Sequence, residues 1–233
     1  MVRVVKEKEY AVKRNDILDA AQRLVYAKGY ERMTIQDILE DLQISKGALY
    51  HYFDSKAAVL EALIERGQPE VEQALIGIVD DPNMSALEKL KQYFATLDRL
   101  RLAQSAFIAD LLHIWFADDN AIVREKADEM IVQRRAPLLS TIVRQGIQEG
   151  VFTTPYPDQA GEIILAITRG MGNSLLKLIL TFEQDRDQLH YIDDMVANTA
   201  ATAEAIERVL GAPTNSLYRP DAEAVKGWLA LLE

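Results

Sequence analysis

Residues 29–56, GYERMTIQDILEDLQISKGALYHYFDSK, contain two short helical patterns separated by a brief connection. Thr34 precedes apolar residues at helical spacing, and Asp37 follows three residues later, which is typical of a capped helix start. Ser45 is placed to cap a second helix in the same way. The stretch therefore predicts a helix from about Thr34 to Asp41, a short connection, and a second helix from 45 to 52. Helix, turn and helix is an arrangement that reads DNA.

The positions of two lysines support this interpretation. Lys46 and Lys56 fall in the first turns of predicted helices, where the helix dipole disfavours cations unless an anion binds there. Phosphate groups of DNA would be such anions. Nearby aromatic residues can add hydrogen bonds, although simple packing is the alternative for them. We expect phosphate contacts from Thr34, Ser45, Tyr50, Tyr52 and Lys56, with Lys46, Gly47 and His51 nearer the bases.

Residues 14–64 resemble the TetR family of transcriptional repressors. The matching positions are Ile17, Leu18, Ala20, Ala21, Leu24, Gly29, Tyr30, Thr34, Ile35, Ile38, Ser45, Gly47, Leu49, Tyr50, Phe53, Lys56 and Leu60. A second, weaker similarity covers Gly146, Glu149, Gly150, Val151, Phe152, Asp158 and Ala160, which are similar to the junction between two helices of the family's ligand domain. The turn departs from the family pattern, because Leu42 and Gln43 stand where the family often has Ala-Gly. A non-glycine residue with a positive φ is uncommon, so this turn is where the geometry is least determined.

Composition limits the other classes of protein. The chain has 233 residues and 49% hydrophobic residues, enough for a well-buried core. It has no cysteine, which excludes disulfides, thiolate metal sites and cysteine nucleophiles. The apolar runs are shorter than the roughly twenty residues that a membrane span needs, and the charged amino terminus shows no signal peptide. We therefore expect a cytoplasmic protein.

The formal net charge of −10 would oppose DNA binding only if the acidic excess lay near the DNA. Residues 1–67 contain 11 basic and 11 acidic side chains, so the acidic excess belongs to residues 68–233. Binding depends on the local field near the phosphates, and the acidic remainder should make affinity strongly dependent on salt.

Helical periodicity extends along the rest of the chain, and no alternating strand pattern occurs, which predicts an all-α fold. Long helical patterns cover residues 120–149, 158–182 and 187–210. With the resemblance, this predicts a three-helix helix-turn-helix DNA-binding domain (1–54), a larger helical effector-binding and dimerisation domain (55–211) and a carboxyl-terminal tail (212–233) with a short helix after Pro220, to which we assign no role.

The resemblance implies a homodimer through helices 158–182 and 187–210 and a small-molecule pocket among the middle helices. Both helices have apolar stripes interspersed with small residues, although packing within one chain is the alternative. The pocket candidates are aromatic, soft or polar residues in apolar helices: Tyr93, Phe94, His113, Trp115, Phe116, Met130, Arg134, Thr168, Met171 and Asn173. Their aromatic and aliphatic bias favours a mainly hydrophobic effector, while ordinary core packing is the alternative for each residue.

Signals of catalysis are weak. The histidines at 51, 113 and 190 are scattered, no metal-binding spacing occurs, and the glycine-rich GMGN at 170–173 lies inside a helical run. We expect neither enzyme activity nor a metal or other cofactor. The sequence thus predicts a ligand-responsive transcriptional regulator, a repressor by resemblance, which binds a pseudo-palindromic operator as a homodimer and is released by a small molecule. The alternative is a non-regulatory or architectural DNA-binding protein.

Overall fold

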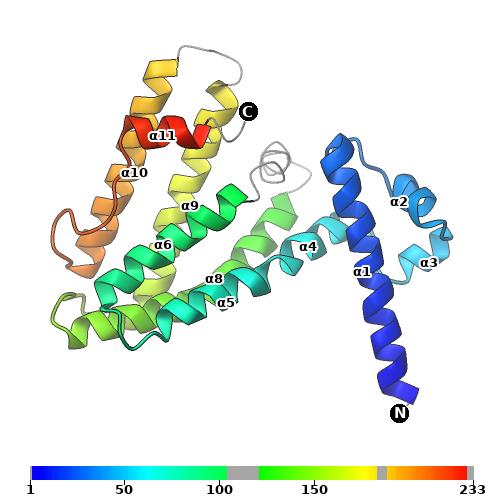
Figure 1. Cartoon of the computed structure of the whole chain (residues 1–233), viewed down its shortest axis with the longest axis horizontal. Coiled ribbons are helices and arrows are strands. Elements are labelled where there is room, and N and C mark those ends of the chain that lie inside the picture. Colours follow the sequence, from blue (N-terminus) through cyan, green and yellow to red (C-terminus); the bar gives the residue numbers. More distant parts are fainter. Residues whose placement is uncertain (1, 104–120, 183–187, 230–233) are drawn as a thin grey trace. The chain divides into compact units, whose positions relative to one another are not determined.

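The computed structural model describes residues 2–103, 121–182 and 188–229, and every regular element in these ranges is a helix (Figure 1). The all-α prediction is confirmed. The helices are α1 (Val2–Lys28), α2 (Ile35–Leu42), α3 (Lys46–Tyr50), α4 (Lys56–Arg66), α5 (Gln68–Val79), α6 (Ala86–Ala103), α8 (Ala121–Gln148), α9 (Pro157–Phe182), α10 (Gln188–Leu210) and α11 (Ala222–Leu229).

The chain forms two compact units. One contains Met1–Pro69 and Ala106–Asp128, and the other contains Glu70–Ser105 and Glu129–Glu233. Helix α4 belongs to the first unit because its apolar face is buried with α1, α2 and α3. The core of this unit includes Ile17, Leu18, Ile38, Leu49, Phe53, Val59, Leu60 and Val123. A surface ion pair of 2.9 Å between Lys126 and Glu61 also lies within it.

The second unit has its own core, built from one face each of α5, α6, α8, α9 and α10. Its fully buried residues include Leu75, Leu90, Tyr93, Leu139, Ile142, Val143, Ile164 and Leu210. Glycine allows α8 and α9 to approach closely, since a Cβ at Gly161 would lie 2.1 Å from the Ala136 carbonyl oxygen. The hydroxyl of Ser140 donates to the Asp158 carbonyl oxygen at 3.1 Å across the same contact.

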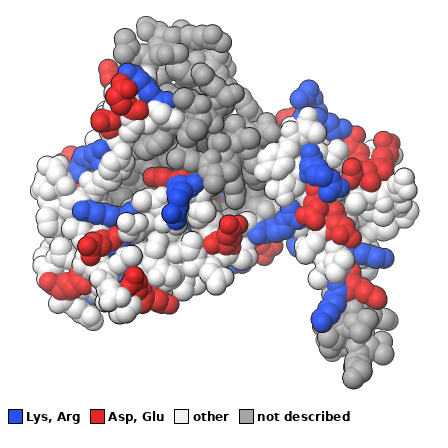
Figure 2. Space-filling model, in the orientation of Figure 1, with Lys and Arg blue, Asp and Glu red and all other residues white. Residues whose placement is uncertain are grey.

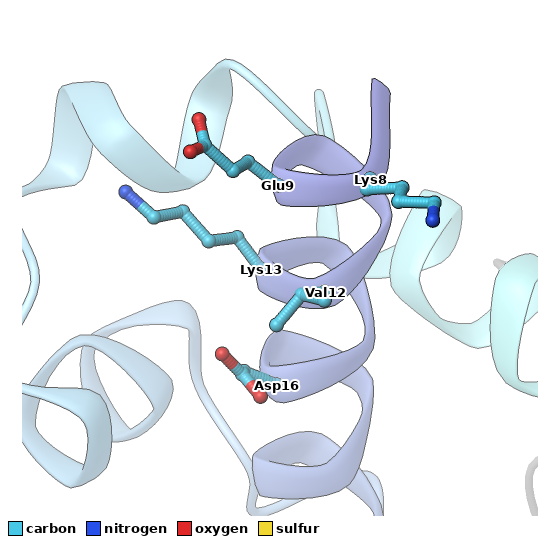
Figure 3. Close-up of a pocket in the computed structure, with 5 residues that line it drawn as sticks. All are labelled: Lys8, Glu9, Val12, Lys13 and Asp16. Carbon is cyan, nitrogen blue, oxygen red and sulfur yellow. The ribbon is translucent and has the colours of Figure 1, made fainter. Parts of the chain in front are cut away.

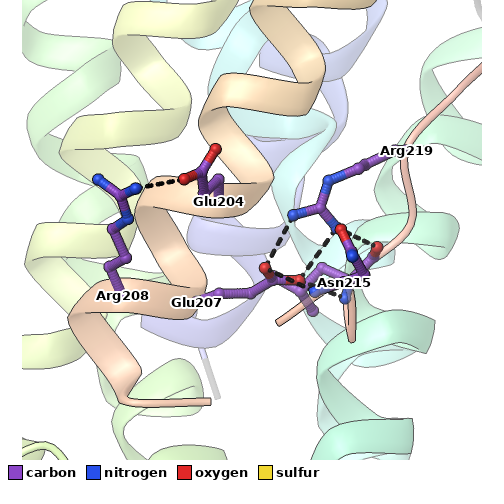
Figure 4. A network of polar contacts seen from close by, with 6 residues as sticks. Glu204, Glu207, Arg208, Asn215 and Arg219 are labelled. Carbon is purple, nitrogen blue, oxygen red and sulfur yellow. Dashed lines mark hydrogen bonds and ion pairs between the residues drawn. The ribbon is translucent and has the colours of Figure 1, made fainter. Parts of the chain in front are cut away.

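The carboxyl-terminal tail is attached to α10 by a buried acidic side chain (Figure 4). Glu207 is 3% exposed and accepts hydrogen bonds from the backbone N–H groups of Asn215 (3.1 Å) and Leu217 (2.8 Å). It also accepts two from the Arg219 guanidinium, at 3.1 and 2.8 Å. Beyond this clamp, Val225 of α11 is fully buried with Ile192 and other residues of α9 and α10. The tail is therefore part of the packed structure of this unit.

Candidate DNA-binding site

The start of α2 is held by a reciprocal capping box. The Thr34 hydroxyl accepts a hydrogen bond from the Asp37 backbone N–H at 3.1 Å, and the Asp37 carboxylate accepts from the Thr34 backbone N–H at 2.6 Å. Lys28 forms a 2.7 Å ion pair with the same carboxylate. The hydrogen bond from Lys28, followed by those from Thr34, lowers the pKa of Asp37 to about 2. The Asp37 carboxylate therefore fixes the start of α2, and it is ionised near neutral pH.

The turn between α2 and α3 contains a non-glycine residue with a positive φ, the feature that the sequence suggested without assigning it. Gln43 has φ 52° and ψ 40°, in the left-handed region. Its N–H donates to the Glu40 carbonyl, and the Ile44 N–H donates to Leu39 at 3.1 Å, so the last turn of α2 is closed by backbone bonds. A glutamine thus occupies a position that favours glycine, and the geometry of the helix-turn-helix is preserved.

Helix α3 exposes most of its residues to solvent. Ser45 caps it by accepting a hydrogen bond from the Ala48 N–H at 3.2 Å, and Leu49 is fully buried beneath it. Around this anchor, Lys46, Gly47, Ala48, Tyr50 and His51 are exposed. A Cβ at Gly47 would have no atom within 4 Å, so the backbone is open to close approach. This face can offer an ammonium, a phenol and an imidazole to a partner.

An aromatic cluster lies at the end of α3. The Tyr10 ring of α1 packs against Tyr52 with 4.6 Å between ring centroids and a tilt of 37°, and it meets His51 edge-on at 5.7 Å. The Lys46 ammonium lies 5.7 Å from the centroid of Tyr50. The contacts hold Tyr52 and His51 in defined positions beside the exposed face of α3.

Lys56 has a structural contact that the sequence did not predict. Its ammonium donates to the Glu31 carbonyl oxygen at 3.1 Å and lies 4.1 Å from the centroid of the Tyr30 ring. Burial lowers the pKa of Lys56 and raises that of Tyr30 to about 12. The lysine stands directly after the cap Ser55, as expected, but part of its role is to brace the connection between α1 and α2.

The predicted contacts therefore fall into two groups. Lys46, Gly47, Tyr50 and His51 share the exposed region of α3, with Tyr52 directly after it. Thr34, Ser45 and Lys56 stand at the starts of three helices. On the face shown in Figure 2, described basic and acidic side chains are interspersed, in keeping with the balanced charge of residues 1–67. The region therefore combines three capped helix starts with exposed polar side chains.

Sequence reasoning missed Tyr10, Lys28 and Arg14. Arg14 lies 5.2 Å from the centroid of the Phe53 ring and 4.0 Å from the Glu65 carboxylate. The contacts of Tyr10 and Arg14 join α1 to residues about forty positions away in the chain, and no local pattern encodes them. Lys28 offered a signal, because a cation in the last turn of a helix is favourable and the capping box follows shortly.

The described effector candidates lie on α6, α8 and α9 of the second unit. Tyr93 is fully buried and contacts Phe94 edge-on at 5.5 Å. Arg134 forms a 3.0 Å ion pair with Glu72, and the Thr168 hydroxyl donates to the Leu165 carbonyl oxygen. Half-buried positions are held by Phe94, Met130, Thr168, Met171 and Asn173. The remaining candidates, His113, Trp115 and Phe116, lie outside the described residues. Because Arg134 is paired with Glu72, its charge is already compensated within the protein.

Two negative observations apply to the described part of the chain. No group of three or more histidine and acidic side chains there could hold a metal ion. None of its helices has the length and apolar character needed to cross a membrane.

Comparison with known proteins finds family similarity in two stretches of the chain. Residues 17–63 match the model of bacterial regulatory proteins of the tetR family, and residues 115–184 match that of the tetracyclin repressor-like carboxyl-terminal domain. Three proteins illustrate the similarity. The chain is 35% identical over 178 residues to the uncharacterised helix-turn-helix regulator YvaF of Bacillus subtilis strain 168, covering 68% of this chain and 93% of that one. It is 23% identical to the repressor NemR of Escherichia coli K12, covering 80% and 95%. The solved SmeT–triclosan complex shares the fold at a TM-score of 0.58 and 17% identity, over 91% of this chain and 97% of that one.

Proposed function

The chain belongs to the TetR family of helix-turn-helix transcriptional regulators, and we propose that it is a ligand-responsive repressor that binds a pseudo-palindromic operator as a homodimer. Its relatives are named as regulators rather than enzymes. In functional terms, residues 1–54 would bind DNA, 55–211 would bind the effector and dimerise, and 212–233 form the tail. A protein that acts on operator DNA in this way would work in the cytoplasm.

The observation that carries the proposal is the exposed face of α3. Leu49 anchors the helix, while Lys46, Gly47, Tyr50 and His51 remain accessible. An ammonium can bind a phosphate or a guanine edge, and imidazole and phenol groups can donate hydrogen bonds to either. The missing side chain at Gly47 would let the backbone come close to a base edge. In this proposal, the phosphate contacts come from Thr34, Ser45, Tyr50, Tyr52 and Lys56.

Dimerisation is supported by α9 and α10, which run side by side within one chain (Figure 1). Each helix still has half-buried apolar and small residues after this packing. On α9 these include Ile167, Met171 and Gly172, and on α10 Val196, Ala200 and Val209. Pairing with the same helices of a second copy would bury them around a two-fold axis. Two reading helices would then meet two half-sites, which explains the expected pseudo-palindrome.

The effector would bind among α6, α8 and α9, where the described candidates occur. Tyr93, Phe94, Met130 and Met171 are aromatic or soft apolar residues, and Arg134 is already paired. This favours a mainly hydrophobic small molecule. SmeT, which shares the fold, has been solved with triclosan, so the fold itself accommodates a small molecule.

Release would follow from thermodynamic coupling between effector and operator. If the effector favours a conformation in which the two copies of α3 no longer match their half-sites, it weakens operator binding by some factor. Operator DNA must then weaken effector binding by the same factor. Equal effector affinity with and without operator would contradict this mechanism.

The decisive experiment is a titration of the purified protein, over a series of salt concentrations, against the DNA that flanks its own coding region. A scrambled duplex serves as the control. We expect saturable binding to one palindromic segment at two subunits per site. The variant His51→Ala should lose preference for this segment and keep its weaker affinity for scrambled DNA. Uniform coating of both duplexes would instead support the architectural alternative.

A further inference from the structure

One stripe of α1 runs from the buried core of the first unit to its surface. Its positions are 10, 14, 17 and 21, which recur at intervals of three and four residues and therefore share one face of the helix. Ile17 and Ala21 are buried, whereas Tyr10 at the other end of the stripe is 40% exposed. The stretch that matches the family model begins at residue 17, so Tyr10 lies outside it.

This stripe meets the end of α3. Arg14 lies 5.2 Å from the centroid of the Phe53 ring, which is buried. About one helical turn earlier on α1, the Tyr10 ring packs on Tyr52 with 4.6 Å between ring centroids and meets His51 edge-on at 5.7 Å. The aromatic contact therefore reaches the surface where the exposed residues of α3 end.

His51 is held through both its backbone and its side chain. Its N–H donates to the Gly47 carbonyl oxygen at 3.2 Å and closes the end of α3. Its imidazole meets the Tyr10 ring edge-on and also the Tyr52 ring, the latter at 5.1 Å between centroids. Within the described residues, the ring nitrogens of His51 have no hydrogen-bond partner, and the residue is exposed. The imidazole is thus restricted in orientation, while its donor and its acceptor remain available to a partner.

The described charges on another side of α1 compensate each other. A surface hollow of about 360 Å³ on that side is lined by two basic, two acidic and one apolar residue of this helix, all exposed: Lys8, Glu9, Val12, Lys13 and Asp16 (Figure 3). Because the formal charges of these side chains sum to zero, they offer no net attraction to the phosphates of DNA. The contribution of α1 that the described residues support is therefore the ring contact with His51.

We propose that Tyr10 is a positioning residue for DNA recognition, which holds the His51 imidazole in the orientation that reads a base edge. The inference rests on the proposed function, in which α3 reads the operator. Base edges in the major groove present donors and acceptors at fixed positions, so an imidazole discriminates best between them when its orientation is already restricted. Without the Tyr10 ring, the His51 side chain would have more rotamer freedom to lose on binding.

The size of the effect follows from the ring contact. An aromatic pair of this kind is equivalent to about a two- to tenfold change in an equilibrium constant. In a homodimer, each operator half-site would meet one such cluster. Loss of the Tyr10 ring should therefore lower discrimination about two- to tenfold for each half-site, or about four- to hundredfold when the same base pair is changed in both.

The experiment measures binding of the full-length protein to its operator and to duplexes that each carry one base-pair change, made in both half-sites. The specificity ratio is the affinity for the operator divided by that for the changed duplex, and it cancels any uniform loss of phosphate contacts through Tyr52. We expect His51→Ala to lower this ratio at particular base-pair positions and Tyr10→Ala to lower it at the same positions alone. Tyr10→Phe keeps the ring and should retain the wild-type profile.

The double variant Tyr10→Ala/His51→Ala distinguishes positioning from an independent contact. If Tyr10 acts through His51, the double variant should have the profile of His51→Ala alone, because no imidazole is left to position. Tyr26→Ala is the matched control, since Tyr26 is another tyrosine of α1, is 49% exposed and lies outside the cluster. It should leave the profile unchanged.

The outcomes separate this inference from the proposed function. A wild-type profile in Tyr10→Ala or in His51→Ala, or losses that add in the double variant, would reject the inference and leave the proposed function in place. Equal losses in Tyr10→Phe and Tyr10→Ala would assign the effect to the hydroxyl and would also reject it. The same holds for a decrease at every position or an equal change in Tyr26→Ala, which would indicate a general structural effect. If the wild type prefers no operator, the proposed function fails and the inference fails with it.

Discussion

Replacing Glu207 by alanine should release the carboxyl-terminal tail from α10. The change removes the acceptor of two backbone N–H groups, those of Asn215 and Leu217, and the partner of the Arg219 guanidinium. Breaking a buried ion pair by removing one partner costs about 3–5 kcal/mol. Burial of Leu217 and Val225, which hold the same segment, contributes about 1.5–3 kcal/mol each. Because the two quantities are comparable, the variant should have an open tail for a substantial fraction of the time.

The assay is hydrogen exchange and limited trypsin cleavage after Lys226 of α11 in the native protein. Glu204→Ala is the matched control, since Glu204 lies about one turn earlier on α10 and pairs with Arg208 at the surface. That control should change tail stability by less than about 1 kcal/mol, as expected for an exposed pair. We expect fast exchange and cleavage in Glu207→Ala alone. A Glu207→Ala protein whose tail remains as protected as in the wild type would refute the assignment of Glu207 as the clamp.

The same clamp should respond to acid. The hydrogen bonds from Arg219 are the largest cause that lowers the pKa of Glu207 to about 2, from 4.5 in an unfolded chain, and the backbone N–H groups of Leu217 and Asn215 add to it. A lowered pKa in the folded state stabilises the docked tail above pH 4.5, and this contribution is lost as the pH falls from 4.5 towards 2. The protection factors of the tail amides, which are corrected for the pH dependence of intrinsic exchange, should therefore fall in that range and stay constant between pH 5 and 8.

Three further substitutions test the reading unit and the core. Gln43→Val should lower the free energy of unfolding by about 1–2 kcal/mol, because a β-branched residue is strained at positive φ, and Gln43→Gly should not; equal thermal stability of the two variants would contradict this. Gly161→Ala should cost about 1–3 kcal/mol, since the new methyl group meets the Ala136 carbonyl oxygen, whereas Gly77→Ala, with no atom within 4 Å, should not destabilise the protein in denaturant titrations. Lys56→Ala should weaken binding to all DNA sequences and reduce the salt slope by about one unit; reduced stability with an unchanged slope would leave Lys56 as an internal brace alone.

Local patterns in the sequence were sufficient to predict the reading helices. Thr34 and Ser45 each cap a helix through a backbone N–H only three residues ahead, so the residues that form the interaction are adjacent in the sequence. The all-α prediction succeeded for the same reason, because helical spacing of apolar residues is a local property. The left-handed Gln43 could be suspected but not assigned, since a non-glycine residue adopts this conformation only when its surroundings require it.

The tertiary structure alone decided which of these residues have additional partners. Lys56 meets the carbonyl oxygen of Glu31 and the ring of Tyr30, and Tyr10 meets Tyr52 across more than forty residues. The tail, to which the sequence assigned no role, is held by Glu207 through bonds that require the chain to turn back on α10. Capping and periodicity depend on neighbours within one or two helical turns, so both can be predicted directly from the sequence. Contacts between distant segments depend on how the helices pack, and this is why only the folded chain determined them.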